Sequence, residues 1–452
     1  MTGVRPDLSP TGERASGAAR TRTALVELSS GAGGAWAVTL AGLGLTFGAT
    51  LLLARMLGAE GYGALAYALA WAEVLGMIAP LGFDKLLIRE LALYRHGERW
   101  SLARGLLRCA ARWTALGVAG ALAVALGFGL VMRTRLDPAL VPVFWTVVLL
   151  VPLRAWVNLR HGALLGLSRP VAGLMATSVT YWLGMLALLG GARLLAPELV
   201  TARNTALAAA AGWLVSLVIA DLQTRSRLDR ALLSRTEPEF REREWIRAAL
   251  PMMLIVAMAL LNLRADVILL GALRGASEAG IYSMAASLAY LVRLGIVAVN
   301  PALAPLAANA ETGGADRQLE TVARTASRLA FLPALACALG LLVFGRWALA
   351  LFNPEFEPGY AALAILAVGF LVVAAMGPVE TILLMKNEQR LAAAAAAGAC
   401  VLNVLLNLVL IPAFGMEGAA VATAFSMIVW ALSMTIAAQR RLGLSMSILA
   451  RS

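Results

Sequence analysis

Residues 401–430, VLNVLLNLVLIPAFGMEGAAVATAFSMIVW, consist of two apolar segments joined by a short turn. Pro412 cannot continue a helical hydrogen-bond ladder, and Gly415 and Gly418 allow a tight reversal of the backbone. Each flank approaches the roughly 20 apolar residues that a helix needs to cross about 30 Å of hydrocarbon. Small residues in the second segment let another helix approach closely, as helices do in lipid. We therefore predict a transmembrane hairpin that packs against other membrane helices.

Composition points the same way for the rest of the chain. Hydrophobic residues make up 60% and charged residues 14%, whereas soluble domains carry roughly 25% charged residues. The net charge of +12 comes from arginines scattered between apolar segments, a distribution that indicates membrane topology and not a nucleic-acid partner. The three cysteines have no metal-site or disulfide spacing. We expect no metal, no cofactor and no nucleic acid.

Apolar runs bounded by charges and turns predict an all-α polytopic membrane protein of about twelve helices. The expected helices cover residues 31–57, 62–83, 106–132, 142–165, 171–192, 205–223, 248–272, 281–306, 326–352, 360–385, 391–412 and 416–438. The longest polar segment divides them into two groups of six. The expected organisation is a cytoplasmic arm (1–30), an N-terminal lobe (31–223), a cytoplasmic linker (224–247), a C-terminal lobe (248–438) and a cytoplasmic tail (439–452).

The positions of the basic residues predict the orientation. About 29 of the 38 lysines and arginines fall in the arm, the tail and alternate connections between the expected helices. Because cytoplasmic loops are enriched in Lys and Arg, those segments face the cytoplasm. An even number of helices then places both termini on the cytoplasmic side.

The two halves also show an internal repeat. An offset of about 219 residues aligns Arg55 with Arg274 and Gly61 with Gly280, each followed by a helix rich in small residues. An even number of spans separates the copies, so equivalent helices point the same way and the repeat axis follows the membrane normal.

Three runs resemble the polysaccharide transporter family (PST/Wzx-type) of the multidrug/oligosaccharidyl-lipid/polysaccharide (MOP) flippase superfamily. They are LLARMLGAEGYGALAYALA with LGFDKLLIREL, ADVILLGALRGASEAGIYSMAASL, and the hairpin at 401–430. The resemblance implies two six-helix lobes in a V around a central cavity, as in multidrug (MATE-like) relatives. It implies alternating-access export of a polyprenyl-pyrophosphate-linked glycan, such as a lipopolysaccharide or exopolysaccharide precursor, across the bacterial inner membrane. The implied partners are the polyprenyl-linked glycan lipid, membrane lipids, a glycan polymerase and glycosyltransferases.

Charged residues inside expected membrane helices are the sharpest candidates for the site, because each costs roughly 2.5–3.5 kcal/mol at a helix centre and must face protein or water. Glu73 and Arg293 lie at nearly equivalent depths in the two halves. One interpretation is that both line the cavity, where Arg293 meets phosphate and Glu73 pairs with it or responds to protons. The alternative is a structural ion pair that locks the lobes together.

Further candidates lie on the fourth and seventh expected helices. Arg154 and Asn158 share a polar stripe with His161, and we assign a cavity wall to the first two, against a purely structural role. On the seventh helix Asp266 shares a face with Asn262 while Arg264 points elsewhere, and both Arg264 and Asp266 are cavity candidates. For Asp266 a substrate role competes with an inter-helix hydrogen bond. Asn403 and Asn407 favour helix association.

A charged cluster follows the second expected helix. Asp84, Lys85 and Arg89 form an interfacial group at the expected cytoplasmic mouth. They are gate candidates, and plain solvation of a surface is the competing interpretation.

Three function classes remain at the level of sequence: a lipid-linked glycan flippase, a MATE-like cation or drug antiporter, and a membrane-embedded glycan ligase, polymerase or transferase. An enzyme would need a catalytic platform outside the bilayer, but the expected outer connections are short and the sequence has no Gly-Lys dipeptide for a Walker phosphate loop. Cation exporters favour an anionic cavity, whereas arginines balance the acids here. We expect a flippase and no enzymatic activity.

The orientation is testable with reporter fusions. Fusions at Arg230 and at the C-terminus should report a cytoplasmic location, and a fusion at Glu355 an external one, because the basic residues alternate in this way. A cytoplasmic signal at Glu355 would overturn the helix count.

Overall fold

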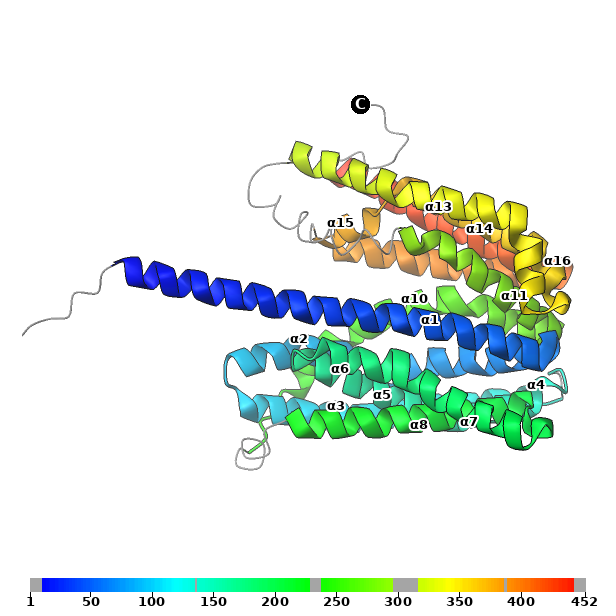
Figure 1. Ribbon diagram of the computed structural model, residues 1–452, viewed down its shortest axis with the longest axis horizontal. Helices are drawn as coiled ribbons and strands as arrows, with labels where there is room; N and C mark the ends of the chain where they lie inside the picture. The colour runs from blue at the N-terminus through cyan, green and yellow to red at the C-terminus, as the bar shows by residue number, and fades with distance from the viewer. Residues whose placement is uncertain (1–9, 135, 228–236, 296–315, 386–387, 443–452) are drawn as a thin grey trace, which may run out of the picture.

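The computed structural model (Figure 1) describes residues 10–134, 136–227, 237–295, 316–385 and 388–442. These ranges are almost entirely helical and contain no strand. The predicted all-α class is therefore confirmed. The first nine residues of the arm, most of the tail and part of the linker were assigned from the sequence but lie outside the described residues.

The helices up to residue 227 gather in the lower part of Figure 1. They are α1 (Pro10–Ile78), α2 (Phe83–His96), α3 (Trp100–Met132), α4 (Leu140–Phe144), α5 (Val147–Gly166), α6 (Pro170–Leu174), the π-helix η1 (Met175–Thr180), α7 (Tyr181–Leu195), the 3₁₀-helix η2 (Pro197–Leu199) and α8 (Ala202–Arg227).

The remaining helices form the upper group. They are α10 (Glu242–Arg274), α11 (Ala276–Ala289), the 3₁₀-helix η3 (Tyr290–Arg293), α13 (Asp316–Phe352), the 3₁₀-helix η4 (Pro354–Gly359), α14 (Tyr360–Met376), α15 (Val379–Met385) and α16 (Gln389–Leu442).

Nine helices within the described ranges are long and apolar enough to cross a membrane. Two of them contain a glycine with non-helical dihedral angles at which the helix breaks: Gly58 in α1 (φ 66°, ψ −174°) and Gly415 in α16 (φ 56°, ψ −134°). The second break is the predicted elbow of the 401–430 hairpin. The expected eighth helix extends beyond Gly295, outside the described residues, so the count of twelve stays a prediction.

Two segments differ from their predicted states. Residues 84–96, expected as a cytoplasmic loop, belong to α2, whose apolar positions include Phe83, Leu87 and Leu91 and lie buried on one face. Residues 10–30, expected as an arm, continue the first membrane helix as part of α1. The reason lies in their many Ala, Arg, Leu and Glu residues, which have high helix propensity.

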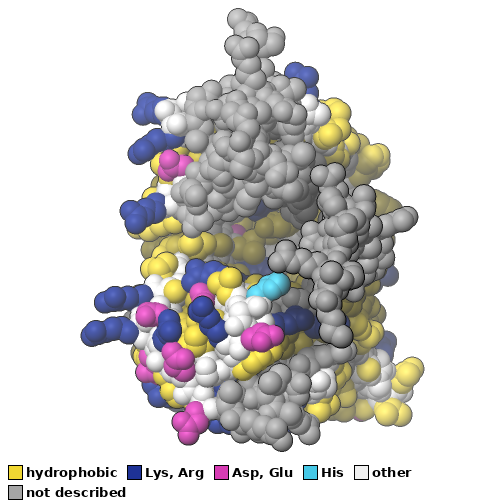
Figure 2. Space-filling model, turned by 90° about the vertical axis from the view of Figure 1, so that its left-hand side faces the viewer, with side chains coloured by type: hydrophobic (Ala, Val, Ile, Leu, Met, Phe, Trp, Pro, Cys, Tyr) yellow, Lys and Arg dark blue, Asp and Glu magenta, His cyan; other side chains and the backbone are white. Residues whose placement is uncertain are grey.

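The two groups of helices meet at one end and spread apart at the other. In Figure 1 they converge at the right, where α4 and the elbow of α16 lie, and diverge toward the left. Figure 2 looks at the divergent end and shows charged side chains concentrated over its lower half, which belongs to the group from α1 to α8. This divergent end carries α2 and its connection to α3, which belong to a segment predicted to be cytoplasmic.

The convergent end depends on a close approach of α1 and α11. Gly63 and Gly280 face each other, and a Cβ on either residue would collide with the backbone of the opposite helix. Tyr62 packs edge-on against Phe356, with ring centroids 5.9 Å apart. Glycine at both positions therefore lets the two groups touch backbone to backbone.

At the same end, each group of helices supplies a carboxylate that caps a helix of the other group. The Ala59 N–H, just after the break in α1, donates to Oε2 of Glu355 at 2.7 Å. The Ala276 N–H, at the start of α11, donates to Oδ2 of Asp137 at 2.9 Å. Each carboxylate comes from the group of helices opposite to the helix that it caps. Both satisfy an unpaired amide and the positive end of a helix dipole.

These contacts also define the register of the repeat. Gly58 and Gly275 both have positive φ and precede a capped helix start, and Gly63 and Gly280 form the close contact. The structural offset is therefore 217 residues and not the 219 inferred from the sequence. The two-residue error arose because small residues are frequent around both helix starts and match in several registers.

We expect loss of both caps to weaken closure at this end. Each capping side chain contributes about 1 kcal/mol, so Asp137→Ala with Glu355→Ala should shift the population toward an open form by roughly 30-fold. Spin labels at the exposed positions Leu195 and Phe414, in a chain lacking its own cysteines, report the distance across the end. Glu357→Ala, on the same turn, is the matched control. An unchanged distance distribution in the double variant would contradict the role of the caps.

Candidate functional site

One carboxylate near the middle of the molecule is shared between two arginines. Glu73, on the second segment of α1, accepts from Nη2 of Arg154 on α5 at 3.0 Å and from Nε of Arg264 on α10 at 2.7 Å. The Glu73 and Arg154 side chains are about one-fifth exposed, and that of Arg264 is 35% exposed. The triad joins the two groups of helices and carries one surplus positive charge.

Neighbouring residues hold Arg154 in place. Its guanidinium lies over the Trp213 ring, 5.0 Å from the centroid, and Trp213 stacks on Tyr181. Gly76 leaves room for the stem of Arg154, because a Cβ there would lie 3.0 Å from the Arg154 Cβ. Asn158, one turn along α5, donates to the Gly76 carbonyl at 3.4 Å. The sequence-predicted stripe of Arg154 and Asn158 therefore faces α1.

Arg264 borders an apolar cavity of about 310 Å³ that lies between α1, α10 and α11. Hydrophobic side chains such as Leu43, Phe47 and Leu291 supply most of its wall, and Thr46, Thr50, Ser283 and Ser287 add a few hydroxyls. The guanidinium of Arg264 is thus the positive end of an otherwise apolar space.

Asp266 belongs to a separate, buried polar network. Its Oδ2 accepts from the Tyr282 hydroxyl at 2.5 Å and from the Thr423 hydroxyl at 3.3 Å. Asn403 donates to Thr423 and Ser426, and Asn407 donates to Asn403. These bonds connect α10, α11 and both segments of α16, so Asn403 joins the two arms of the hairpin as helix association requires.

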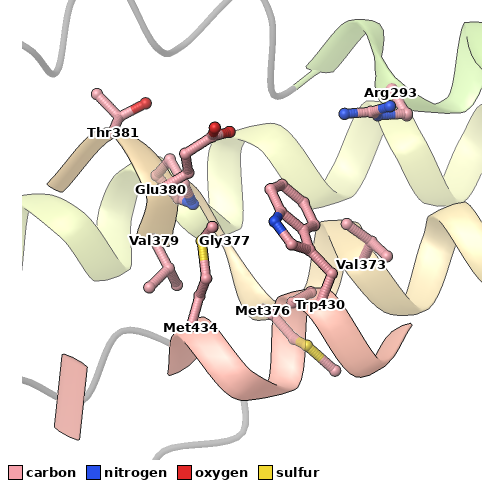
Figure 3. Close-up of a pocket in the computed structure, with 11 residues that line it drawn as sticks. Arg293, Val373, Met376, Gly377, Val379, Glu380, Thr381, Trp430 and Met434 are labelled. Atoms are coloured by element: carbon pink, nitrogen blue, oxygen red, sulfur yellow. The ribbon is translucent and has the colours of Figure 1, made fainter. Parts of the chain in front are cut away.

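Arg293 does not meet Glu73, so the proposed pairing of these two residues is wrong. Arg293 ends η3, donates from Nη1 to the Tyr290 hydroxyl at 2.9 Å, and lies over the Tyr290 and Phe370 rings. It faces a different cavity, together with Glu380 and Trp430 (Figure 3). The depth argument failed because equal depth in the two halves does not bring residues to the same face.

The gate candidates lie at the start of α2. Asp84 is buried and forms an ion pair with Lys85 at 3.3 Å, while Arg89 is exposed and pairs with Glu90 at 2.8 Å. Their position at the divergent end fits a mouth, but each charge already has a local partner.

Sequence reasoning missed two residues that line the same cavity as Arg293. Glu380 is not among the sequence-predicted site residues, and Trp430 ends the apolar run 401–430. The break after α14, at Gly377 with φ 78°, turns Glu380 toward the cavity, and the adjacent Gly377-Pro378 dipeptide was a usable signal.

The triad makes a stability prediction. Glu73→Gln removes the carboxylate that the two guanidiniums share and should lower the free energy of unfolding by about 2 kcal/mol, since breaking a buried pair leaves uncompensated charge. Adding Arg264→Met should recover part of the loss. Thermal unfolding of the purified protein in detergent measures both. Glu278→Gln, which breaks a surface pair with Arg274, is the control. Equal stability of Glu73→Gln and Glu278→Gln would contradict a stabilising role of the triad.

The comparisons with known proteins agree with this architecture. Residues 30–310 match the family model described as polysaccharide biosynthesis protein. A probable low-salt glycan biosynthesis flippase, Agl15 of Haloferax volcanii, is 30% identical over 162 residues. That alignment covers 36% of this chain and only 34% of the archaeal protein, about a third of its length.

Solved structures of the MOP superfamily share the fold. An inward-facing multidrug resistance MATE family transporter superposes with a TM-score of 0.75 at 15% identity, covering 88% of this chain and 94% of the other. The lipid II flippase MurJ in an inward closed conformation gives 0.69 at 11% identity, covering 88% and 87%. An outward-facing MATE family transporter gives 0.59 at 15% identity, covering 90% and 93%. The chain has the MOP fold, and its matched sequence, more than half of its length, makes it a member of the polysaccharide biosynthesis protein family.

Proposed function

We propose that the protein is a flippase that moves a polyprenyl-pyrophosphate-linked oligosaccharide from the cytoplasmic to the outer leaflet of a bacterial cell membrane by alternating access. The observation that carries the proposal is the triad of Arg154, Glu73 and Arg264, which leaves a surplus positive charge beside an apolar cavity. Family membership and the similarity to glycan and lipid II flippases support it.

The triad suits an anionic cargo. Arg264 has the more exposed guanidinium of the two arginines and binds Glu73 through Nε. A pyrophosphate could therefore accept from its remaining N–H groups, or displace Glu73, without leaving a charge unpaired. Guanidinium groups bind phosphate oxygens in a planar, two-pronged manner, so arginine fits this task better than lysine.

The cavity beside Arg264 suits the lipid. An isoprenoid chain needs an apolar wall, and the lining of this cavity is mostly hydrophobic. A charged headgroup at Arg264 with its tail along α1 and α11 would leave neither part in an unfavourable environment.

The conformation fits loading from the cytoplasm. The lobes, which we take as residues 31–223 and 248–438 joined by the 224–247 linker, converge at the predicted external end and diverge at the predicted cytoplasmic end. Both termini would then be cytoplasmic. Asp84, Lys85 and Arg89 would line the entry. Glycosyltransferases would supply the cargo on this side, and a polymerase would use it on the other.

A cation or drug antiporter is the second candidate. The MATE family transporter is the specific observation in its favour, together with the buried Asp266 carboxylate, which binds hydroxyls instead of a cationic side chain. The two arginines on Glu73 argue against it, since they neutralise the carboxylate that a cationic drug would need. We propose transport and no enzymatic reaction for either candidate.

Transport in vesicles tests the function. Purified protein, supplied with lipid-linked glycan and no nucleotide, should move the glycan outward faster when the vesicle interior is negative. A pyrophosphate carries about two negative charges. Moving one charge across a potential of 100 mV changes the free energy by about 2.3 kcal/mol, so outward movement is downhill by roughly 4–5 kcal/mol per 100 mV. Arg264→Gln should reduce the rate at least tenfold because it removes the proposed phosphate contact.

Arg346→Gln is the matched control, because Arg346 is exposed on α13 away from the triad. A requirement for ATP would contradict the mechanism. A rate that ignored the potential but followed a sodium or proton gradient would favour antiport. Equal rates for the two Arg→Gln variants would remove Arg264 from the transport path.

A further inference from the structure

The C-terminal group of helices contains a cavity that the triad does not reach. It has a volume of about 420 Å³ and lies between α10, α11, α14 and α16, with Met77 of α1 at its edge. A smaller space of about 80 Å³ adjoins it, and Arg293, Glu380 and Trp430 line both. The larger volume is within the range of about 300–1,000 Å³ typical of ligand pockets.

The polar groups of this cavity converge on an aromatic ring. Figure 3 shows Glu380 at the left and Arg293 at the right, with the Trp430 indole lower in the view between the two. They come from η3, α15 and α16, respectively. The Arg293 guanidinium lies over the Tyr290 and Phe370 rings, 4.8 and 5.7 Å from their centroids.

Arg293 and Glu380 are the charged side chains that both spaces share. With the residues that the structure describes, Arg293 and Glu380 form no ion pair within 4.0 Å, either with each other or with a third group. Two opposite charges on the wall of one cavity disfavour three classes of ligand. An anion would meet Glu380, a cation would meet Arg293, and a purely apolar ligand would desolvate both charges.

We infer that this cavity binds the saccharide part of the cargo. A pyranose ring has a face of C–H groups, which suits the electron-rich face of an indole, and a rim of hydroxyls. Arg293 offers donors to those hydroxyls and Glu380 offers acceptors. A neutral, hydroxyl-rich ligand is thus the class that satisfies the ring and both charges together.

The position of this cavity relative to the triad also supports a saccharide site, an inference that rests on the proposed flippase function. This cavity and the apolar cavity beside Arg264 share four lining residues on α10, α11 and η3: Leu263, Asp266, Ala286 and Tyr290. The two spaces therefore adjoin. One amphipathic molecule can place its chain in the first cavity, its pyrophosphate near Arg264 and its sugars beside Trp430.

A competition experiment separates sugar binding from lipid binding. The purified protein is equilibrated with an equimolar mixture of two probes: the polyprenyl-pyrophosphate glycans extracted from the source cells, and undecaprenyl pyrophosphate without sugar. Native mass spectrometry gives the ratio of the two bound species. Wild type should favour the glycan-bearing lipid, and Trp430→Ala should lower that ratio about tenfold with unchanged binding of the bare lipid.

Three further variants sharpen the result. Trp430→Phe keeps an aromatic face and should retain most of the preference, while Glu380→Ala should lose part of it. Trp347→Ala removes an indole that is 67% exposed on α13 and should have no effect. Retained binding of the bare lipid also shows that each variant is folded.

The outcomes distinguish this inference from the proposed function. If Trp430→Ala and Glu380→Ala both keep the wild-type ratio, the saccharide site is wrong and the flippase proposal stands. If Trp430→Ala weakens both probes equally, the tryptophan acts on the lipid or on the fold, and the saccharide site is again wrong. If the wild type binds neither probe, the proposed function itself fails.

Discussion

The cost of placing charge in an apolar environment determines how the middle of this protein is built. Glu73 would be unstable there alone, and so would Arg154 or Arg264. Sharing one carboxylate between two guanidiniums satisfies all three groups through hydrogen bonds of 3.0 and 2.7 Å. Because Arg154 and Arg264 come from opposite groups of helices, the same interaction joins the lobes at mid-depth. The surplus positive charge follows from the stoichiometry and is the basis for binding an anion.

The convergent end uses backbone chemistry instead of paired side-chain charges. Glu355 and Asp137 each cap a helix of the other lobe, and Gly63 and Gly280 allow the two capped helices to touch. Hydrogen bonds from a few amides to partly exposed carboxylates have modest individual strength. Such contacts can hold the end closed and still be exchanged during a transport cycle, whereas a fused hydrophobic core could not separate easily.

Each of the two cavities suits a different part of the proposed amphipathic cargo. The space beside Arg264 is apolar with one cation, and the space beside Trp430 has opposed charges around an aromatic ring. Both are lined by α10 and α11, so the C-terminal lobe would carry most of the recognition. The N-terminal lobe would supply Glu73, whose hydrogen bond to Arg264 must be exchanged when phosphate binds.

Much of the fold was determined by the sequence itself. Apolar length, the turn at Pro412 to Gly418 and the alternation of arginines predict membrane helices and their hairpins, because the bilayer enforces those patterns locally. Helix α2 was recoverable in principle from its amphipathic spacing. Charged residues inside the expected helices were a usable guide, because an intramembrane charge must avoid lipid. Of the candidates, Arg264, Asp266 and Arg293 line cavities.

Only the tertiary structure decided which charges meet. The equivalent depths of Glu73 and Arg293 along their helices suggested that the two residues pair. Helix rotation and packing instead bring Glu73 to Arg154 and Arg264. The register of the repeat required the contacts of Gly63 and Gly280, because small residues match in several alignments. Trp430 and Glu380 gained a shared cavity only through the break at Gly377 and the packing of α16. Local patterns are set by the solvent around each helix, whereas partners across helices depend on rotations that no single segment encodes.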